Sequence, residues 1–363
     1  MIDAATVKTR AREFGADLVG IADINRFEGA PPHADPRFVF PEATALIGLG
    51  FRIPRGYLRG IEEGTDFFQY PAMGYANINE VYAPCVIREL CCLLEDEGYE
   101  GVAWRNTGCR GPVSDMDGKG PSESPEEVGG RRLTHFEPVR PGQPAPDVFL
   151  QFRIAAYLCG MGEIGWSKNL LTPEFGPRQR FAFVLTDAPL EADPIYDGEK
   201  LCDRCMACAG ACPGKAISSE RSVKVTLAGR EVEWGEIDAW SCFLAYMGGV
   251  KEINPFLPED AFDEVPGGRD ILRGERRPTP GEVVELQKII RRYYPNACGY
   301  NNAMCGGRGC VRACMVHLEK RGVLKNKFKH PFRRRPPWKL KTPDALRADT
   351  VSTRERGAHL TGL

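Results

Sequence analysis

The chain has 363 residues, 42% of them hydrophobic, and a formal net charge of −1 at pH 7. This length allows two or three domains, and the near-neutral charge gives no reason to expect a general attraction to nucleic acid or membranes. No run of 18 or more apolar residues occurs, which excludes a membrane-spanning helix. The first residues lack a basic, apolar leader, so we expect a cytoplasmic protein.

The first half of the chain predicts helices that alternate with short buried strands. The expected helices cover residues 5–14, 78–97 and 147–159, and the expected strands cover 17–22, 44–51, 102–104 and 181–186. Residues 26–42 and 107–146 are rich in proline, glycine and polar residues and predict loops. This alternation predicts an α/β (α+β) fold up to about residue 195.

The second half contains fewer clear elements. Residues 223–234 alternate in polarity around a central glycine and predict a hairpin. Residues 282–293 have helical spacing of apolar residues and predict an amphipathic helix.

Cysteine is the most informative residue type, with 14 cysteines against five histidines. In a reducing cytosol, that many cysteines indicate metal binding or catalysis rather than a disulfide framework. Five cysteines of the first half lie in mostly apolar or helical patterns, where we expect buried, inert thiols. They are Cys85, Cys91, Cys92, Cys109 and Cys159.

Four further cysteines form a closely spaced run that ends in Pro213. Their spacing, C-x2-C-x2-C-x3-C-P, is that of bacterial two-cluster ferredoxins. Three thiolates two residues apart surround one cubane, and the fourth, at the start of a helix, faces a second cubane. Pro213 fits the first turn of that helix, where its missing N–H would be unpaired anyway. A zinc site is the alternative, but it needs only four cysteines and does not predict the proline.

The ferredoxin spacing requires a second set of cysteines further along the chain. By the crossing rule, Cys314 completes the first cubane and Cys212 joins the second. Cys298 is an alternative to Cys305 in the second cubane, and glycines around Cys305 permit close approach of amides to sulfur. The predicted ligands are Cys202, Cys205, Cys208 and Cys314 for one cubane, and Cys212, Cys242, Cys305 and Cys310 for the other.

A basic segment follows the cysteines. Between Lys320 and Lys341, ten of 22 residues are Lys or Arg and none is acidic, with Phe328, Phe332 and Trp338 interleaved. One interpretation is contact with RNA or an acidic protein. The interpretation we favour is a tail that packs its aromatic rings on the body and exposes its charges to water.

One segment ahead of the cysteine run is not explained by periodicity. Residues 162–178 read GEIGWSKNLLTPEFGPR, and residues 185–190 read LTDAPL. Both resemble the segment before the ferredoxin run in corrinoid-dependent reductive dehalogenases and in the related epoxyqueuosine reductases. Residues 15–22, GADLVGIA, resemble both families too, as does the order of the cysteine groups. The resemblance covers roughly residues 10–320.

The resemblance implies a nitroreductase-like, corrinoid-binding domain at residues 1–195 and a ferredoxin-like domain with two [4Fe–4S] clusters at 196–320, followed by a basic tail at 321–363. It implies an oxidoreductase that passes electrons from a reduced ferredoxin or flavodoxin-type donor through both clusters to cobalamin. The expected substrate is a small organic molecule, with organohalides as candidates. We expect no nucleic-acid or membrane partner.

By the same resemblance, residues 165–178 line the corrinoid, with the hydroxyls of Ser167 and Thr172 at its polar edge and glycines allowing close backbone approach. The alternative is a tight loop between helix and strand, and Glu174 could equally cap a helix or bind a ribose. The predicted cofactor-binding residues are Gly165, Trp166, Ser167, Lys168, Thr172, Pro173, Glu174, Phe175 and Gly176.

The dehalogenases use a tyrosine with a basic neighbour as proton donor. Tyr82 is the first match in this chain and Tyr75 the second, with Arg178 or Lys168 as the cation that would stabilise the phenolate. Alternatively, Tyr82 occupies an apolar helical position and is a core residue.

The chain also departs from both families. Trp166-Ser167 stands where they often have a basic residue followed by Asn, and four residues separate Cys305 from Cys310. It has no twin-arginine signal and no C-terminal helical repeat, and Asp147 follows Pro146 in place of an Asp-x-x-Pro context. We therefore expect a substrate other than transfer RNA. The rival hypotheses are an epoxyqueuosine reductase-like RNA-modification enzyme and a two-cluster electron-transfer protein without corrinoid.

Overall fold

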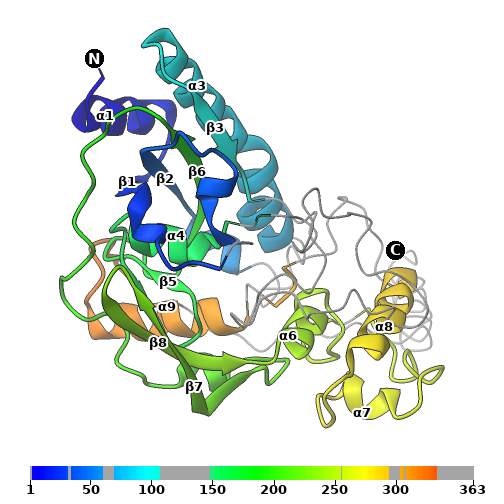
Figure 1. Cartoon of the computed structure of the whole chain (residues 1–363). Helices are drawn as coiled ribbons and strands as arrows, with labels where there is room; N and C mark the ends of the chain where they lie inside the picture. The colour runs from blue at the N-terminus through cyan, green and yellow to red at the C-terminus, as the bar shows by residue number, and fades with distance from the viewer. Residues whose placement is uncertain are drawn as a thin grey trace, which may run out of the picture.

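A four-stranded sheet forms the centre of the N-terminal half (Figure 1). The structure, a computed structural model, describes residues 2–31, 34–59, 69–106, 148, 150–254, 256–293, 303–305 and 308–332. The strands are β1 (Leu18–Asp23), β2 (Ala45–Arg52), β3 (Gly101–Trp104) and β6 (Gln179–Thr186), in the order β1-β2-β6-β3. All three neighbouring pairs are antiparallel. The expected mixed α and β architecture is therefore confirmed in its α+β form.

Both faces of this sheet are buried, which explains why its strands read as nearly continuous apolar runs. Alternate residues of a strand point to opposite faces. Ile47 and Val184 belong to the core shared with α1 (Ala4–Phe14) and α3 (Ala83–Asp96), whereas Leu46 and Phe183 belong to the core shared with α4 (Phe152–Leu158). The α4 end lies very close to the sheet at Gly20, where a Cβ would stand 2.3 Å from the carbonyl oxygen of Cys159.

The predicted elements of this half agree with the structure to within a residue or two, with two exceptions. The helix α1 begins after Asp3, whose carboxylate accepts a hydrogen bond from the Thr6 amide (2.7 Å), and it ends at Gly15, which has a φ of 122°. The first exception is the helix predicted at 147–159, which begins only at Phe152. Residues 107–146 and Asp147 lie outside the described residues.

The second exception is the helix predicted at 78–97, which begins earlier and changes character along its length. A π-helix, Tyr70–Tyr82, leads directly into α3. Pro84 cannot donate the backbone hydrogen bond that a regular α-helix needs at this junction. Long π-helical segments are rare, and π-helical turns often occur at functional sites. This segment carries both tyrosines that the sequence analysis selected.

The predicted hairpin is confirmed and is longer than expected. It consists of β7 (Ile217–Leu227) and β8 (Arg230–Ile237). The two residues between the strands, Ala228 and Gly229, have φ values of 47° and 76°. Positive φ at both positions is typical of the tight turn that matches the twist of a hairpin.

Three helices form a separate hydrophobic core beside the sheet and hairpin (Figure 1). They are α6 (Ala239–Tyr246), α7 (Gly268–Leu272) and α8 (Pro280–Tyr293), of which α8 confirms the amphipathic helix predicted at 282–293. Within the described residues, two further α-helices are α5 (Ala207–Gly210) and α9 (Cys310–Arg321). Among the described segments, no helix is both long and apolar enough to cross a bilayer.

The described part of the basic segment packs on the body. The Arg55 guanidinium lies 3.6 Å from the centre of the Phe328 ring, and that of Arg59 lies 4.6 Å from the centre of the buried Phe332 ring. This arrangement agrees with the packing interpretation of the segment. Trp338 lies outside the described residues.

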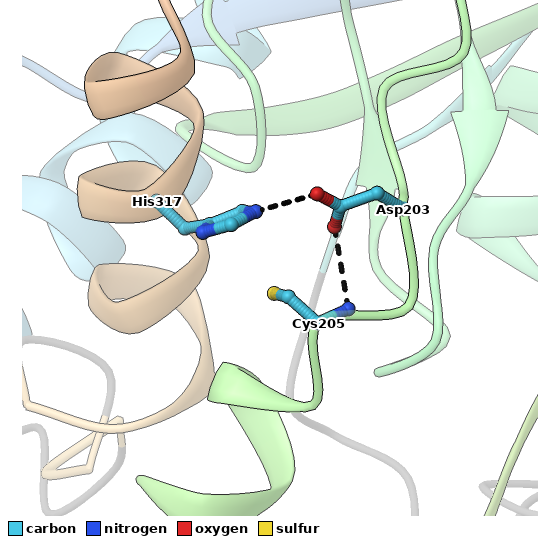
Figure 2. A group of neighbouring side chains, drawn as sticks. All are labelled: Asp203, Cys205 and His317. Atoms are coloured by element: carbon cyan, nitrogen blue, oxygen red, sulfur yellow. Dashed lines mark hydrogen bonds and ion pairs between the residues drawn. The ribbon is translucent and has the colours of Figure 1, made fainter.

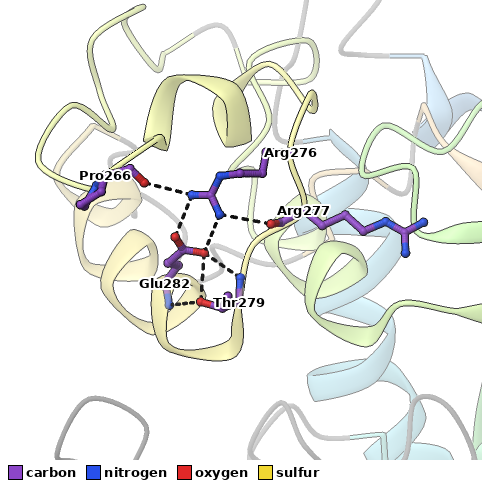
Figure 3. Close-up of polar contacts among 5 residues, drawn as sticks. All are labelled: Pro266, Arg276, Arg277, Thr279 and Glu282. Carbon is purple, nitrogen blue, oxygen red and sulfur yellow. Dashed lines mark hydrogen bonds and ion pairs between the residues drawn. The ribbon is translucent and has the colours of Figure 1, made fainter.

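The start of α8 is held by a reciprocal cap that includes an arginine (Figure 3). The Glu282 carboxylate accepts a hydrogen bond from the Thr279 amide (2.7 Å), while the Thr279 hydroxyl accepts one from the Glu282 amide (3.4 Å). Both terminal nitrogens of Arg276 donate to the same carboxylate, at 2.7 and 3.1 Å. The bonds from Arg276, opposed by partial burial and assisted by Thr279, lower the pKa of Glu282 to about 2.

We expect Glu282→Gln to lower the free energy of unfolding at pH 7 by about 1 kcal/mol, because the amide cannot accept the charged bonds from Arg276. A carboxyl group with a lowered folded-state pKa stabilises the fold above its unfolded pKa of about 4.3 and loses this effect as the pH falls toward 2. The difference from the wild type should therefore shrink below about pH 5. Urea unfolding between pH 7 and pH 4 measures it.

Glu285→Gln is the matched control on the same helix. Glu285 pairs with Lys288 at the exposed surface (2.5 Å), so its loss should change stability by only a few tenths of a kcal/mol, about the value of such a pair. Equal effects of the two substitutions at pH 7 would contradict the role assigned to the cap.

Candidate functional site

The structure gathers four of the predicted ligand cysteines into a first thiol group, Cys202, Cys205, Cys208 and Cys314. Burial raises the pKa of Cys314 well above its ordinary value, and the nearby thiols of Cys208, Cys202 and Cys205 raise it further. Cys314 comes from α9, more than 100 residues after the other three cysteines of the group. The helix therefore returns this thiol to the 202–208 run, as the crossing rule requires.

The other four cysteines form a second thiol group, Cys212, Cys242, Cys305 and Cys310. Burial raises the pKa of Cys242 to about 12, with contributions from Cys310 and Cys212. The pKa of Cys305 is raised well above its ordinary value by burial and then by Cys242, Cys310 and Cys212. The structure thus brings the eight predicted cysteines together, with Cys310 also near enough to raise the pKa of Cys208 and Cys314, and their role as metal ligands stays a prediction. Cys298 lies outside the described residues.

The surroundings of the thiols fit iron–sulfur clusters. Trp166, Ile217 and Ile237 form an apolar cluster around the ligand cysteines. Buried thiols in such a setting resist ionisation unless a metal compensates the charge of the thiolates. Amides also point at sulfur: the Ala216 amide donates to Cys212 Sγ (3.4 Å) and the Trp166 amide donates to Cys202 Sγ (3.3 Å). Such bonds are part of what tunes iron–sulfur clusters.

The backbone around the first thiol group is also unusual. Arg204 and Met206 both have φ values near 57°, in the left-handed region that non-glycine residues rarely adopt. Strained conformations of this kind cluster at functional sites. Here they lie between the cysteines of the ferredoxin run, where the chain has to curl around one centre.

The outer edge of the first thiol group carries a polar trio (Figure 2). His317 Nε2 lies 2.8 Å from the Asp203 carboxylate, which also accepts a hydrogen bond from the Cys205 amide (3.2 Å). One ligand atom from each of the three residues lies within 4.8 Å of the others, close enough to hold a single metal ion. Of the three, only Cys205 belongs to the ferredoxin spacing. Asp203 and Cys205 are exposed, so this group reaches the protein surface.

A cluster of phenols and guanidinium groups borders the second thiol group. We call it the tyrosine–arginine cluster: Tyr70, Tyr75, Arg153, Arg180 and Tyr246. The Arg180 guanidinium lies 4.3 Å from the centre of the Tyr75 ring and donates a hydrogen bond to the Tyr70 hydroxyl (2.8 Å). The Tyr246 ring meets the Tyr75 ring edge-on, with 5.9 Å between the centroids. This contact joins the π-helix to α6.

The pKa shifts of this cluster show how close it lies to the thiols. Burial raises the pKa of Tyr70, Arg180 opposes that rise, and the thiols of Cys305 and Cys310 add to it. Burial lowers the pKa of Arg153, and the thiols of Cys242 and Cys310 oppose the shift. The second thiol group and the tyrosine–arginine cluster therefore share one electrostatic environment.

This arrangement can deliver a proton beside a redox centre. Burial, followed by the neighbouring Tyr75, raises the pKa of Tyr246 well above its usual value. Buried phenols therefore stay protonated, and a guanidinium such as that of Arg180 stabilises the phenolate left after proton transfer. The sequence analysis selected Tyr75 but missed Arg180 and Tyr246. Tyr246 follows Cys242 by one helical turn, a spacing that places both on one face of α6.

Tyr82 and Arg178 are not brought together as the predicted catalytic pair. The Tyr82 side chain is 45% exposed, and its hydroxyl donates to the Gly15 carbonyl oxygen (3.1 Å) at the end of α1. Arg178 is fully buried and donates to the Ile53 carbonyl oxygen (2.6 Å) and to Asn326 Oδ1 (2.7 Å). The resemblance selected Tyr82 at the head of the helix predicted at 78–97, whereas the structure places it at the end of a π-helix, where its hydroxyl supports the end of α1.

The predicted corrinoid segment makes its polar contacts within the protein. The Trp166 ring nitrogen donates to the Ser218 carbonyl oxygen (2.7 Å), and the buried Lys168 ammonium lies 4.8 Å from the centre of the Trp234 ring. Ser167 is buried and accepts a hydrogen bond from the Asn169 side chain (3.0 Å). These contacts match the alternative interpretation, a tight loop between helix and strand.

The second part of this segment packs against α9 and the residues that follow it. The Pro173 carbonyl oxygen accepts from the Lys325 amide (2.8 Å), and the Glu174 carboxylate pairs with the Lys325 ammonium (2.7 Å). A Cβ at Gly176 would stand 2.9 Å from a side-chain atom of Leu318. Other residues of the segment also contact the protein. The Thr172 hydroxyl accepts a hydrogen bond from the Phe175 amide (3.2 Å), and the Phe175 ring lies against the Arg52 guanidinium. Gly165 faces the side chain of Leu171.

The glycines predicted to face a flat macrocycle therefore face protein side chains. The packing of residues 173–176 was not predictable from local sequence, because their partners, Leu318 and Lys325, lie about 150 residues away. Contact of residues 165–176 with a corrinoid stays a prediction.

Comparisons with known proteins identify relatives over short segments. No family model matches the chain. Over 72 residues it is 43% identical to the tetrachloroethene reductive dehalogenase of Desulfitobacterium hafniense, covering 19% of this chain and 13% of the relative. Over 58 residues it is 47% identical to the epoxyqueuosine reductase of Synechococcus sp. (strain CC9605), covering 16% of this chain and 17% of the relative.

Solved structures give weaker likenesses. A catabolic reductive dehalogenase in complex with 3-bromo-4-hydroxybenzoic acid has a TM-score of 0.44 at 16% identity, covering 94% of this chain and 42% of that one. An epoxyqueuosine reductase from Bacillus subtilis has a TM-score of 0.41 at 13% identity, covering 88% and 82%. At such scores the structural likeness carries no argument about function.

We expect Cys310→Ser and Cys314→Ser each to remove about four of about eight iron atoms per chain, but from different clusters. The two residues lie one turn apart on α9, yet their thiols belong to different groups. Iron analysis of reconstituted protein gives the number, and the electron paramagnetic resonance of each reduced variant identifies the cluster that remains.

Cys92→Ser is the control, because Cys92 lies in α3, outside both thiol groups, and the variant should keep all its iron. The assignment fails if both α9 variants lose the same cluster, or if the wild type binds zinc in place of iron.

Proposed function

We propose a redox function for this chain, which is related by sequence to the reductive dehalogenases and the epoxyqueuosine reductases. It is an oxidoreductase that carries two [4Fe–4S] clusters in a ferredoxin-like region, uses a corrinoid, and reduces a small organic substrate. The observation that carries the proposal is the shared position of the second thiol group and the tyrosine–arginine cluster, with Cys242 and Tyr246 one turn apart on α6 and Tyr246 and Cys305 packed on the same hydrophobic core. The thiol group would provide a path for electrons, and the tyrosines of the cluster would provide protons.

The burial of the thiols supports a direction for electron flow. Cys205 is exposed, so the first cluster would lie near the surface, where a ferredoxin- or flavodoxin-type donor can approach. The four thiols of the second group are half-buried, and three of them, Cys242, Cys305 and Cys310, act electrostatically on the tyrosine–arginine cluster. The first cluster therefore receives electrons from the donor, and the second delivers them to the reaction site.

Tyr75 is the proton donor in this proposal, and Arg180 stabilises the phenolate that remains. Reductive removal of a halogen consumes two electrons and one proton and releases the halide, with a new C–H bond in place of the carbon–halogen bond. The phenol supplies that proton from a site where Tyr75 is buried and Arg180 is half-buried, so competing water is excluded.

The corrinoid part of the proposal rests on the sequence relationship rather than on the described residues. When bound, a corrinoid supplies the strongly reducing metal centre that such reactions need. The residues predicted to line it are engaged with Leu318, Lys325 and each other. We therefore assign no described residue as its ligand.

An epoxyqueuosine reductase-like activity is the second candidate, favoured by the 47% identity to such an enzyme over 58 residues. The two candidates share cofactors and differ in the size and chemistry of the substrate. An electron-transfer protein without corrinoid is the third, and it leaves the four-stranded sheet and its helices without a role.

Anaerobically reconstituted protein should bind two clusters and cobalamin and release halide from a panel of organohalides when supplied with a low-potential reductant. Absorption spectra and metal analysis measure the cofactors, and halide release measures the reaction. Uptake of two clusters with no cobalamin binding would refute the corrinoid proposal. Reduction of epoxyqueuosine in a transfer RNA stem loop, without any halide release, would favour the second candidate.

Two tyrosine variants separate proton transfer from structural support. Tyr75→Phe should lower the turnover number by about 10²–10⁴-fold, the usual contribution of a positioned proton donor. Tyr82→Phe should leave turnover unchanged and lower the free energy of unfolding by about 1 kcal/mol, since it loses the hydrogen bond to Gly15. A loss of turnover in Tyr82→Phe, with unchanged turnover in Tyr75→Phe, would instead identify Tyr82 as the proton donor.

A further inference from the structure

We propose that the loop Glu163–Asn169, here called the connecting loop, sets the reduction potentials of both clusters through one hydrogen bond to a sulfur of each. This inference rests on the proposed pair of [4Fe–4S] clusters. It gives the segment that was predicted to line a corrinoid a different role, namely the positioning and tuning of the two clusters.

The connecting loop reaches both thiol groups within four residues. The Trp166 backbone amide donates to Cys202 Sγ at 3.3 Å, in the first group. The Asn169 side-chain amide donates to Cys310 Sγ at 3.6 Å, in the second group. The Glu163 carboxylate also accepts a hydrogen bond from the Cys202 backbone amide. One short loop from the N-terminal half therefore contacts a predicted ligand of each cluster.

The loop is held rigidly enough to keep these donors in place. Its first two residues form the short strand β4 (Glu163–Ile164), which pairs with β5 (Leu170–Leu171) directly after the loop. Between them, the Gly165 amide donates to the Asn169 carbonyl oxygen (2.9 Å), and Lys168 adopts a φ of 58° that closes the turn. A loop fixed in this way loses little entropy when it orients its donors.

Each donor is also aligned individually. The Trp166 ring nitrogen donates to the Ser218 carbonyl oxygen (2.7 Å), while the Gly235 amide donates to the Trp166 carbonyl oxygen (2.8 Å). Gly235 has to lack a side chain, because a Cβ there would stand 2.5 Å from the indole nitrogen. The Asn169 amide is oriented by its second bond, to Ser167 Oγ (3.0 Å).

These hydrogen bonds affect the reduction potential because reduction adds negative charge to a cluster. Reduction adds one electron to a cluster, so an N–H that points at a ligand sulfur stabilises the reduced form more than the oxidised form. Removing the donor therefore lowers the reduction potential of that cluster. Of the two bonds, the one from Asn169 comes from a side chain and can be removed by substitution. It acts on the second cluster alone.

The test is Asn169→Leu, which keeps the branched shape of the side chain and removes the N–H donor. In protein loaded with both clusters, the ratio of reduced to oxidised second cluster at a fixed potential should fall by about tenfold. This is the effect expected from the loss of one hydrogen bond to a charged group. The first cluster should not change. Anaerobic redox titration monitored by electron paramagnetic resonance measures both in the same sample.

Ser167→Ala is the matched control. It removes only the bond that orients the Asn169 amide and keeps the N–H donor to Cys310, so it should lower the potential of the second cluster by less than Asn169→Leu does and leave the first cluster unchanged. If Asn169→Leu does not assemble its second cluster, Asn169→Asp takes its place. That variant also lacks the donor and adds a negative charge, so it should lower the potential of the second cluster further.

An unchanged second cluster in the Asn169 variants overturns the inference, as does an equal shift in both clusters. A shift confined to the second cluster supports it. Failure of the wild-type protein to bind two clusters would instead refute the proposed function, and this is visible in the iron analysis before any titration begins.

Discussion

The gathering of eight thiols into two adjoining groups is the constraint on which the rest of the structure depends. Burial raises the pKa of Cys242, Cys305 and Cys314, and thiolates this close together repel one another unless positive charge lies between them. The proposed iron–sulfur clusters would supply that charge. The thiols come together because α9, which carries Cys310 and Cys314, and α6, which carries Cys242, both pack beside the ferredoxin run. Elements far apart in the chain therefore contribute to the same thiol groups.

The same constraint explains how the two halves of the chain join. The connecting loop donates to one sulfur of each thiol group, and residues 173–176 pack on α9 and the segment after it. On the other side of the second thiol group, Tyr246 of α6 meets Tyr75 of the π-helix. The sheet therefore contacts the cysteine-rich half on two sides of the proposed clusters. Electron delivery and proton delivery would converge where these contacts meet.

Much of the fold follows from local sequence. The helix caps at Asp3 and Gly15, the buried strand at residues 45–52 and the turn at Ala228-Gly229 all depend on neighbouring residues and were predictable. The π-helix at 70–82 was not, because it reflects a proline at a helix junction and the packing of tyrosines against another element. Tyr82, which the family resemblance selected in this segment, instead supports α1.

The sequence by itself determined the two thiol groups, since the ferredoxin spacing and the crossing rule depend on short distances along the chain and on the number of cysteines. Only the tertiary structure decided which groups surround them. Tyr75 lies beside Arg180, Asn169 lies beside Cys310, and Arg178 is buried against Ile53 and Asn326. These contacts join residues up to about 150 positions apart, and no local pattern records them, because packing between distant elements selects the partner of each side chain.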